Sequence, residues 1–532
     1  MIDLFIPFFL QAGSKNIYIQ DTTMTKTRSS GILAHISSLP SPFGIGDIGP
    51  SSFQFIDFLV ACNQSYWQFL PIGPTNSFFG DSPYMGISAF AGSPLLISPE
   101  LLEQSGLISR KERDNHPEFS PYMTDFPAVS QYKKQLLQLS YKNFSGHSST
   151  KYKSFLKKHS FWLDDYALFM TFRIKHHEQE WSRWPSPARN RDESAMAALY
   201  ENEFDTINYF IFEQFIFHTQ WEELRSYAQK NNIRLFGDLP IYVGYDSVDV
   251  WANRELFTLN RKTLKPDPVA GVPPDYFSPT GQRWGNPLYN WHHRDATTRE
   301  TLFQWWKHRL QNVFSLVDTV RIDHFRGFES YWAIPGNEPT AENGEWKKGP
   351  GKIFFNRIFR ELGQLDIIAE DLGIITPEVE KLRDDLGFPG MKVLQFAFDD
   401  NPENNHLPHN YTTPNCVVYT GTHDNDTAVG WFLSNQLNEG QRETLKKMVN
   451  RDIHDNSPVH RDLIHLAQSS IARLSIYPLQ DILGFGSDCR MNVPGVADGN
   501  WKWRCSREFL TEEIARYLSE TTQLFGRGRK EK

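Results

Sequence analysis

Acidic and basic side chains stand at the ends of several short apolar runs, which is where parallel α/β proteins place their chemistry. In chain order they are Asp238, Arg321, Asp323, His324, Glu370, Asp371, His423 and Asp424. Taken singly, each carboxylate is most simply a helix cap or an ion-pair partner. Several carboxylates converging on one rim would repel each other and split their pKa values, at a cost in stability. We therefore interpret the set as a candidate catalytic site.

Asp323 and Glu370 suit the retaining cleavage of a glycosidic bond. That reaction needs two carboxyl groups about 5–5.5 Å apart, one ionised to attack the anomeric carbon and one protonated to serve the leaving oxygen. Arg321 and Asp323 are two residues apart on a predicted strand. Their side chains therefore share a face, and the cation would keep Asp323 ionised. Anionic neighbours would raise the pKa of Glu370 and make it the acid. Asp424 is the candidate for holding sugar hydroxyls in the transition state.

The charged residues at the ends of these apolar runs lie close together only if the predicted strands close into one barrel. Apolar runs rich in β-branched residues predict buried parallel strands, and a (β/α)8 TIM barrel needs eight of them. The runs cover residues 31–37, 66–72, 233–243, 318–323, 366–370, 392–398, 416–423 and 477–482. We predict an α/β fold, a (β/α)8 barrel with inserted subdomains. No C-terminal β-sandwich domain is expected, because only about 50 residues follow the eighth run.

Uneven spacing of the runs predicts the domain organisation. About 160 residues separate the second and third runs, so we expect a mainly helical insertion at about 74–230. A second insertion, at about 245–294, is rich in Pro, Gly and aromatic residues and is expected to be a long functional loop. The barrel would occupy 31–510, between an N-terminal extension at 1–30 and a C-terminal helix with a basic tail at 511–532.

Composition and charge narrow the range of partners. The chain has 532 residues and a net charge of −8, and it has no Lys/Arg-rich stripe, which argues against nucleic-acid binding. The basic residues at 527–532 are predicted to be a solvated terminus. Aromatic residues make up 14% of the chain. They serve either core packing or the stacking of flat, hydroxyl-rich ligands, and composition alone does not separate the two.

The cysteines and the N-terminus predict a cytoplasmic protein that does not enter a membrane. The four cysteines are Cys62, Cys416, Cys489 and Cys505. None belongs to a C-x-x-C pair, which indicates free thiols in a reducing compartment. The apolar segment 2–10 is too short to span a bilayer and lacks the basic residues of a signal peptide. Met24 precedes the first predicted strand, so residues 1–23 are expected to be dispensable.

Two ligand motifs are rejected on their context. Residues 44–49 match G-x-G-x-x-G, but further residues separate them from the preceding run, unlike in a dinucleotide site. The His pairs at 176–177 and 292–293 are adjacent, so their side chains do not share a face as zinc ligands would. Neither a nucleotide nor a metal is predicted.

Six further motifs complete a resemblance to a known family. They are S-L-P-S-P-F-G-I-G-D from Ser38, G-D-S-P-Y ending at Tyr84, G-V-P-P-D-Y-F-S ending at Ser278, G-Q-R-W-G-N-P from Gly281, R-M-N-V-P-G from Arg490 and G-N-W-K-W-R ending at Arg504. With the three run-end motifs, the chain resembles the 4-α-glucanotransferases, also called amylomaltases or disproportionating enzymes. They form glycoside hydrolase family 77 of the α-amylase superfamily. The resemblance extends from about residue 31 to residue 504.

The resemblance implies roles for individual residues. Asp323 would be the nucleophile, Glu370 the acid/base and Asp424 the transition-state stabiliser. The implied substrate-binding residues are Tyr84, Asp238, Tyr276, Phe277, Gln282, Trp284, Arg321, Asp399, His423 and Asn492. Among these, Tyr276 and Phe277 would lie on a loop that covers the substrate. The family uses no metal or cofactor, and its partners are α-1,4-glucans such as maltooligosaccharides, glycogen and starch-derived dextrins.

Two alternatives remain open from the residues alone. An α-amylase-type hydrolase would use the same carboxylates, and a catalytically inactive glucan-binding protein would keep only the groove. The missing β domain favours a transferase, and intact Asp323, Glu370 and Asp424 oppose an inactive protein. The chain departs from the family at Met85, where Gln is usual, which bears on subsite preference.

Overall fold

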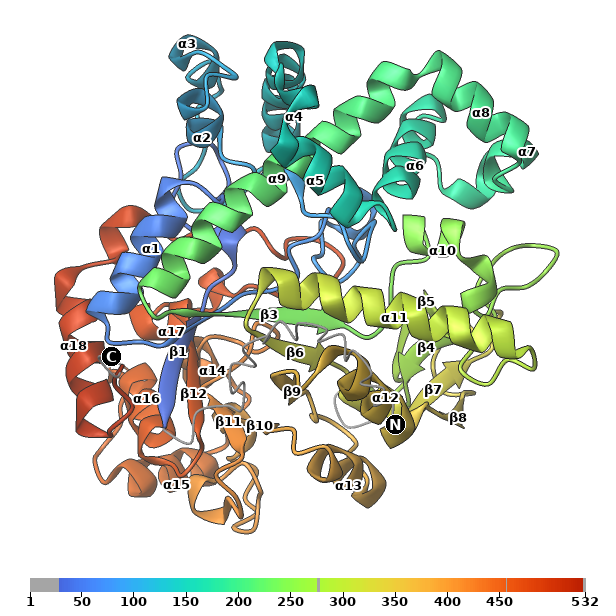
Figure 1. Cartoon of the computed structure of the whole chain (residues 1–532). Helices are drawn as coiled ribbons and strands as arrows, with labels where there is room; N and C mark the ends of the chain where they lie inside the picture. The colour runs from blue at the N-terminus through green and yellow to red at the C-terminus, as the bar shows by residue number, and fades with distance from the viewer. Residues whose placement is uncertain (1–27, 275–277, 456, 530–532) are drawn as a thin grey trace, which may run out of the picture.

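Eight parallel strands form the centre of the molecule. The computed structural model describes residues 28–274, 278–455 and 457–529. Its main sheet has the strand order β10-β11-β12-β1-β2-β3-β6-β9, and the two end strands meet where the Ala369 N–H donates to the Pro389 carbonyl at 2.9 Å (Figure 1). The strands are β1 (Ser29–Leu33), β2 (Tyr66–Gln68), β3 (Arg234–Pro240), β6 (Thr319–Asp323), β9 (Ile367–Ala369), β10 (Gly390–Val393), β11 (Cys416–Tyr419) and β12 (Leu474–Pro478). The predicted (β/α)8 barrel is confirmed.

Most of the strands end earlier than their predicted apolar runs, and the runs at 477–482 and 392–398 show why. Only the first two residues of the run at 477–482 belong to β12, and α17 (Leu479–Leu483) follows directly. Pro478 explains the change, because its fixed φ is suited to the start of a helix. The run at 392–398 leaves β10 after Val393 for a 3-10 turn at Leu394–Phe396. Leu394 is fully buried in that turn, and an apolar run alone does not distinguish a buried turn from a buried strand.

Helices cover the outside of the barrel because each of them has an apolar face to bury. Trp306 of α11 and Phe355 of α12 are fully buried, for example, and the indole N–H of Trp221 on α9 donates to the Leu316 carbonyl at 2.9 Å. The covering helices are α1 (Pro50–Ala61), α9 (Phe204–Lys230), α11 (Ala296–Leu316), α12 (Gly351–Leu362), α13 (Pro377–Asp385), α14 (Ala428–Leu433), α15 (Glu439–Val449), α16 (Val459–Ser469) and α18 (Glu512–Leu524).

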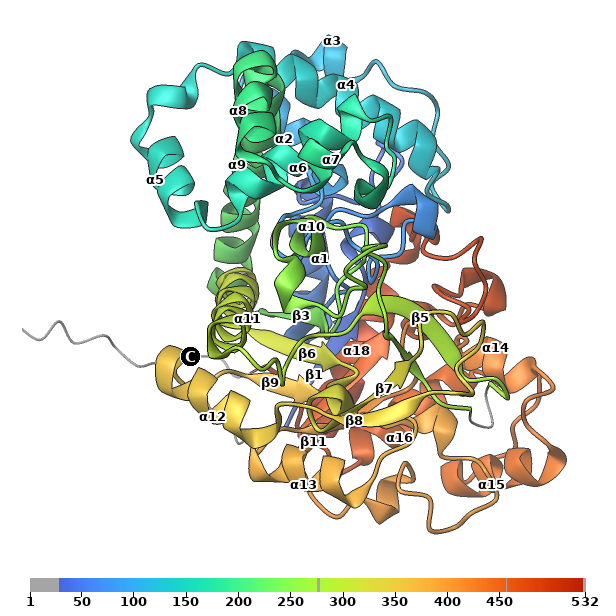
Figure 2. The same cartoon turned by 90° about the vertical axis from the view of Figure 1, so that its right-hand side faces the viewer.

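The chain between β2 and β3 forms a helical layer above the barrel in both views (Figures 1 and 2). Its helices are α2 (Pro99–Gln104), α3 (Arg110–Arg113), α4 (Phe126–Asn143), α5 (Thr150–His159), α6 (Leu163–Lys175), α7 (Ser186–Arg189) and α8 (Glu193–Asn202). The long helix α9 joins this layer to the barrel. The side-chain amide of Gln214 on α9 exchanges two hydrogen bonds with the backbone of Gly92, at 2.8 and 2.9 Å, and Gln220 does the same at Ser98.

A second, antiparallel sheet stands beside the barrel, in the order β5-β4-β7-β8. Its strands are β4 (Val269–Val272), β5 (Gln282–Pro287), β7 (Ser330–Ile334) and β8 (Glu345–Lys348). The segment predicted as a long loop at 245–294 therefore contains two strands, as well as α10 (Val248–Ala252). Strand β4 pairs with β5 inside the segment and with β7, which comes about 60 residues after β4 in the chain, so the alternation of residues within the segment does not reveal the whole sheet.

The C-terminal residues seal the base of the barrel, and the predicted solvated terminus is wrong for Arg527. Its side chain is completely buried, because it fills a space lined by backbone carbonyls. The guanidinium donates at 2.9–3.3 Å to the carbonyls of Ser29, Gln468, Ser470 and Arg473. Arg28 donates to carbonyls of the same region, including that of Ser470 at 2.7 Å. We refer to Arg28 and Arg527 as the basal arginine pair.

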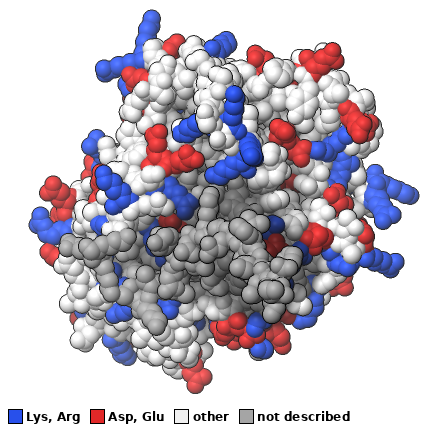
Figure 3. All heavy atoms as spheres, viewed as in Figure 1, with Lys and Arg blue, Asp and Glu red and all other residues white. Residues whose placement is uncertain are grey.

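Charges of both signs are interspersed on the face of the molecule seen in Figure 3. Where described residues are visible on that face, they form no continuous basic stripe. Among the helices of the described residues, none has both the length and the apolar character needed to cross a bilayer.

Candidate active site

Asp323 and Glu370 emerge side by side at the end of the barrel opposite the basal arginine pair. The register of β6 and β9 pairs Ile322 with Ala369, so the two carboxyl-bearing residues follow at the same level on adjacent strands. The Glu370 N–H donates to the Ile322 carbonyl at 3.1 Å, which fixes this alignment. Neighbouring strands lie about 4.8 Å apart. The barrel thus brings together two acids that are far apart in the chain.

Arg321 joins the acids of two strands. Its Nη1 lies 2.9 and 2.8 Å from the two oxygens of Asp238 on β3, and its Nη2 lies 2.9 Å from Oδ1 of Asp323. The Tyr84 hydroxyl donates to Oδ2 of Asp238 at 2.7 Å. Burial disfavours the charge of Arg321, but Asp238 and Asp323 outweigh that effect and hold its pKa well above the ordinary value. The predicted residues Tyr84, Asp238, Arg321 and Asp323 therefore form one network.

Two backbone N–H groups hold the carboxyl of Glu370. The His324 N–H donates to Oε2 and the Leu372 N–H to Oε1, both at 2.7 Å. Burial, with the charge of Asp323, raises the pKa of Glu370 to about 7, although Arg321 and the two N–H donors act in the opposite direction. Glu370 can therefore hold a proton near neutral pH, as a general acid must.

Asp323 occupies a different environment from that of Glu370. Burial and the neighbouring anions Asp238 and Asp424 raise its pKa, while Arg321 favours the ionised form. The Asp323 side chain keeps 30% of its surface exposed, so water weakens the effect of burial, whereas the direct contact with the guanidinium at 2.9 Å persists. Of the two carboxyls, Asp323 is thus the one with a cation bound to its oxygen, as a carboxylate nucleophile requires.

His423 and Asp424 follow β11 and face the same rim. Nε2 of His423 lies 3.3 Å from Oδ2 of Asp424, and the Asn492 side-chain amide donates to Oδ1 at 2.6 Å. Burial alone would raise the pKa of Asp424, but His423 and Asn492 reverse the effect and hold it well below the ordinary value. The Tyr84 ring stacks on the His423 ring with centroids 5.1 Å apart and an interplanar angle of 16°. Asp424 is therefore a fixed anion within the site.

The remaining predicted residues divide into three groups. Trp284 on β5 makes an edge contact with the His324 ring at 4.8 Å, and its indole N–H donates to Gln282 at 3.2 Å. Asp399 is exposed after β10, and its carboxylate accepts the Asn401 N–H. We refer to Asp238, Asp323, Glu370 and Asp424 as the acidic cluster. No hydrogen bond of the described chain joins Asp399 to it. Tyr276 and Phe277 lie outside the described residues.

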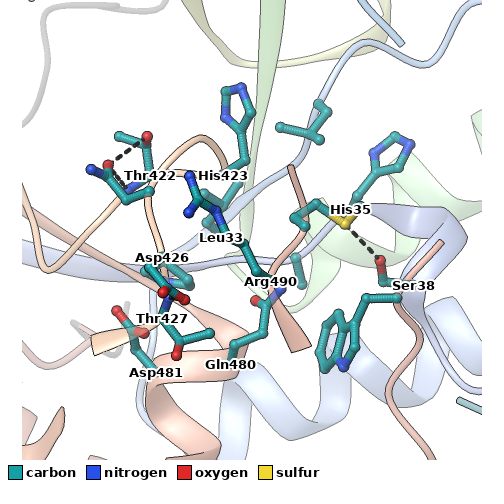
Figure 4. Close-up of a pocket in the computed structure, with 16 residues that line it drawn as sticks. Leu33, His35, Ser38, Thr422, His423, Asp426, Thr427, Gln480, Asp481 and Arg490 are labelled. Atoms are coloured by element: carbon teal, nitrogen blue, oxygen red, sulfur yellow. Dashed lines mark hydrogen bonds between the residues drawn. The ribbon is translucent and has the colours of Figure 1, made fainter. Parts of the chain in front are cut away.

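A hollow that is open to solvent lies next to the site at His423. Figure 4 shows side chains from the ends of β1, β11 and β12 and from the segment around Arg490 gathered at it. His423 is part of its lining, and Nη2 of Arg490 donates to the Asp424 carbonyl at 2.6 Å. The hollow therefore meets the site through His423, which contacts Asp424.

Two contributions to the site have no counterpart in the sequence analysis. Trp501 lies 5.8 Å from Tyr84 and 6.1 Å from His423, measured between ring centroids. Its position within G-N-W-K-W-R was the available signal. The other contribution is the backbone N–H of His324, which binds Glu370. Almost every residue carries a backbone N–H, so no sequence motif indicates which one binds Glu370.

The fold and these contacts define a class of protein. An α/β barrel that places an arginine-bound carboxylate and a carboxyl of pKa about 7 at adjacent strand ends offers the pair of acids that glycoside-cleaving enzymes use. Within the described residues, His, Cys, Asp and Glu form no group that could hold a metal ion.

Comparison with known proteins identifies the family within that class. The model of the glycoside hydrolase family 77, described as 4-α-glucanotransferase, matches residues 34–511. The 4-α-glucanotransferase of Synechocystis sp. is 48% identical over 95% of this chain and 99% of its own length. That of Thermus thermophilus is 44% identical over 94% of this chain and 100% of its own length. The amylomaltase of Streptococcus agalactiae, solved with acarbose, is 38% identical and superposes with a TM-score of 0.89, covering 94% of this chain and 100% of the solved one.

The chain therefore belongs to the 4-α-glucanotransferase family, whose members are enzymes that transfer glucosyl groups. The family predicted from the sequence motifs is confirmed. The two alternatives, an α-amylase-type hydrolase and an inactive glucan-binding protein, are not favoured.

Proposed function

We propose that this enzyme transfers α-1,4-glucan segments to the 4-hydroxyl of an acceptor glucan or glucose by a retaining double displacement, with Asp323 as nucleophile and Glu370 as acid/base. One observation carries the assignment: at adjacent strand ends, one carboxyl is bound by Arg321 at 2.9 Å while the other has a pKa of about 7. In this proposal Asp323 is the ionised acid and Glu370 the protonated one, as the reaction needs.

The first displacement breaks the glycosidic bond of the donor. A carboxylate oxygen of Asp323 bonds to the anomeric carbon as the glycosidic oxygen departs, and Glu370 gives that oxygen its proton. In the second displacement, Glu370 takes the proton of an acceptor 4-hydroxyl, whose oxygen replaces Asp323 at the anomeric carbon. Each step forms one C–O bond and breaks one, and the proton returns to Glu370. Side chains of the enzyme account for every proton and charge.

The surrounding residues hold the sugars in this proposal. Asp424, fixed as an anion, accepts hydroxyl hydrogen bonds that strengthen in the transition state. The Tyr84 ring presents a stacking surface to the sugar being cleaved. The proposed contacts around them are Asp238, Gln282, Trp284, Arg321, Asp399, His423 and Asn492, with Tyr276 and Phe277 on a segment that covers the glucan. Covering would exclude water and favour transfer over hydrolysis.

The proposed substrates are maltooligosaccharides and dextrins derived from glycogen or starch. Support comes from the family and from the Streptococcus agalactiae amylomaltase, which was solved with acarbose. We further propose a cytoplasmic location. It is supported by cysteines that are free throughout the described chain, as is usual in a reducing compartment.

Incubation with maltotriose tests the reaction itself. A transferase produces glucose and a ladder of oligomers longer than maltotriose. A hydrolase produces only shorter sugars, and a binding protein leaves maltotriose unchanged. Either of the last two outcomes, in product analysis by chromatography, would overturn the proposal.

The variant Asp323→Asn tests the nucleophile. We expect kcat to fall by at least about 10³-fold, because an amide oxygen does not form a glycosyl ester. The fold should persist, since the change is isosteric. Asp385→Asn, which removes the same charge from the exposed side of α13, is the matched control and should retain wild-type turnover. Turnover of Asp323→Asn near the wild-type rate would remove the assignment.

A further inference from the structure

We propose that His324 is a positioning residue, whose left-handed backbone aims an N–H at Glu370 and thereby sets how that carboxyl is oriented and how readily it gives up its proton. The inference rests on the proposed acid/base role of Glu370 and goes beyond it by naming the group that controls the acid. His324 acts through Glu370 and does not itself contact the substrate in this proposal.

The backbone of His324 adopts a conformation that residues with side chains seldom take. Its φ is 52° and its ψ is 48°, directly after β6 ends at Asp323. This region is disfavoured for most L-residues, and His324 is one of eleven non-glycine residues of the described chain that adopt it. Its contact with Glu370 distinguishes this position. The turn directs two consecutive N–H groups at the same residue. The His324 N–H reaches Oε2 of Glu370 at 2.7 Å, and the Phe325 N–H reaches the Glu370 carbonyl at 3.2 Å.

The His324 ring acts by packing. Trp284 meets it edge-on with centroids 4.8 Å apart and an interplanar angle of 88°, and Tyr242 lies 6.4 Å away. Burial lowers the pKa of His324 to about 3, so the ring is uncharged at neutral pH. Its Nε2 is buried without a hydrogen-bond partner in the described chain. The ring therefore holds the turn in place, and the N–H acts on Glu370.

Other charges also act on Glu370, and the test must leave them unchanged. They come from β6, from the turn at Phe325–Phe328 and from the residue next to Glu370. Arg321 and Asp323 lie on β6, and Arg326 lies in the turn. The residue next to Glu370 is Asp371. Asp371 is turned away, since its Oδ1 accepts the Met391 N–H at 2.7 Å. Replacing an uncharged His324 alters none of these charges, so a change in the pH profile would report on the N–H.

The decisive experiment compares His324→Val with His324→Asn. Both variants lose the ring, but Asn adopts the left-handed conformation with little strain and Val does not. Donation by an N–H favours the carboxylate, so its loss raises the pKa of Glu370. For Val we expect the basic limb of the kcat/KM profile on maltotriose to move to higher pH by about 0.5–1 unit. We also expect kcat to fall about tenfold or more, because the acid is misaligned. For Asn the limb should stay in place.

Matching pH profiles for Val and Asn, with equal kcat values, would overturn the proposal. If the Val variant does not fold, His324→Gly and His324→Ala repeat the comparison, because both lack the ring and only Gly is free of left-handed strain. Glu370→Gln is measured in parallel. Near-wild-type activity of Glu370→Gln refutes the acid/base role itself, whereas an inactive Glu370→Gln beside indistinguishable Val and Asn variants refutes only the role of His324.

Discussion

The two ends of the barrel each bury an arginine, and they hold it in opposite ways. At the rim, Arg321 lies between the carboxylates of Asp238 and Asp323, and its pKa is held well above the ordinary value. At the base, Arg527 is bound by backbone carbonyls, and burial lowers its pKa to about 10. One cation is paired with full charges, and the other is bound only by dipoles.

The difference follows from what each end does. Carbonyl dipoles hold a guanidinium by geometry, and no proton moves there, so the base gains cohesion between the first and last elements of the barrel. Carboxylates hold Arg321 electrostatically, and their ionisation depends on the cation and on one another. The rim keeps like charges close together at a cost in stability, which active sites characteristically tolerate. Removing charge should therefore have different consequences at the two ends.

Arg321→Met is expected to produce the largest effect. It removes the cation from Asp323 and leaves Asp238 as a buried anion bound only by the Tyr84 hydroxyl among the contacts described above. We expect kcat/KM on maltotriose to fall by about 10³-fold or more. Because the cation had favoured the carboxylate, the pKa of Asp323 should rise and move the acidic limb of the profile to higher pH. An unmoved acidic limb with kcat/KM within tenfold of wild type would contradict the prediction.

Arg527→Met is expected to act on stability instead. The carbonyls of Ser29, Gln468 and Ser470 lose donors in a buried setting, and we expect the free energy of unfolding to fall by about 2–3 kcal/mol. Turnover at 25 °C should not change. Urea unfolding measures the loss, with Arg110→Met as control because the Arg110 side chain is 79% exposed. If the two variants unfolded at the same urea concentration, the basal arginine pair would not have this role.

The rim was predictable from the sequence to a degree that the base was not. Asp323 and Glu370 stood at the ends of apolar runs, and closure of a barrel of parallel strands necessarily brings such ends together. The spacing of Arg321 and Asp323 placed them on one face of a strand, where they are in contact. The side chains at the strand ends are identified by the sequence itself, so this part of the site could be predicted.

What the sequence did not reveal depends on the backbone or on distant pairing. Arg527 is bound by backbone carbonyls, which every residue has, so no sequence pattern marked them and the basic tail was predicted to be solvated. Strand β4 pairs with its neighbour β5 and with β7, which lies far along the chain, so the sheet was not evident from the segment at 245–294 alone. The N–H of His324 required the φ of one residue, which composition and motifs do not indicate.

Glu370→Gln at the rim should increase the free energy of unfolding at high pH, whereas Arg527→Met at the base should decrease it. The pKa of Glu370 is raised to about 7 by burial, so the folded protein binds this proton more tightly than the unfolded chain does. That stability is fully present below about pH 4.5 and is lost as the pH rises through 7. Removing the carboxyl removes the loss, and the variant should gain about 3 kcal/mol relative to wild type between pH 4.5 and pH 8.

Comparing two pH values isolates this gain from the other consequences of Glu370→Gln. The new amide places an NH₂ against one of the N–H groups of His324 and Leu372, a cost that is the same at both pH values and cancels in the difference. Urea unfolding at pH 4.5 and pH 8 gives the four free energies required. Arg527→Met, measured in the same way, should show a loss of similar size at both pH values. If the difference in free energy of unfolding between Glu370→Gln and wild type were the same at both pH values, the ionised Glu370 carboxyl would not be destabilising. The proposed contrast between the rim and the base would then be wrong.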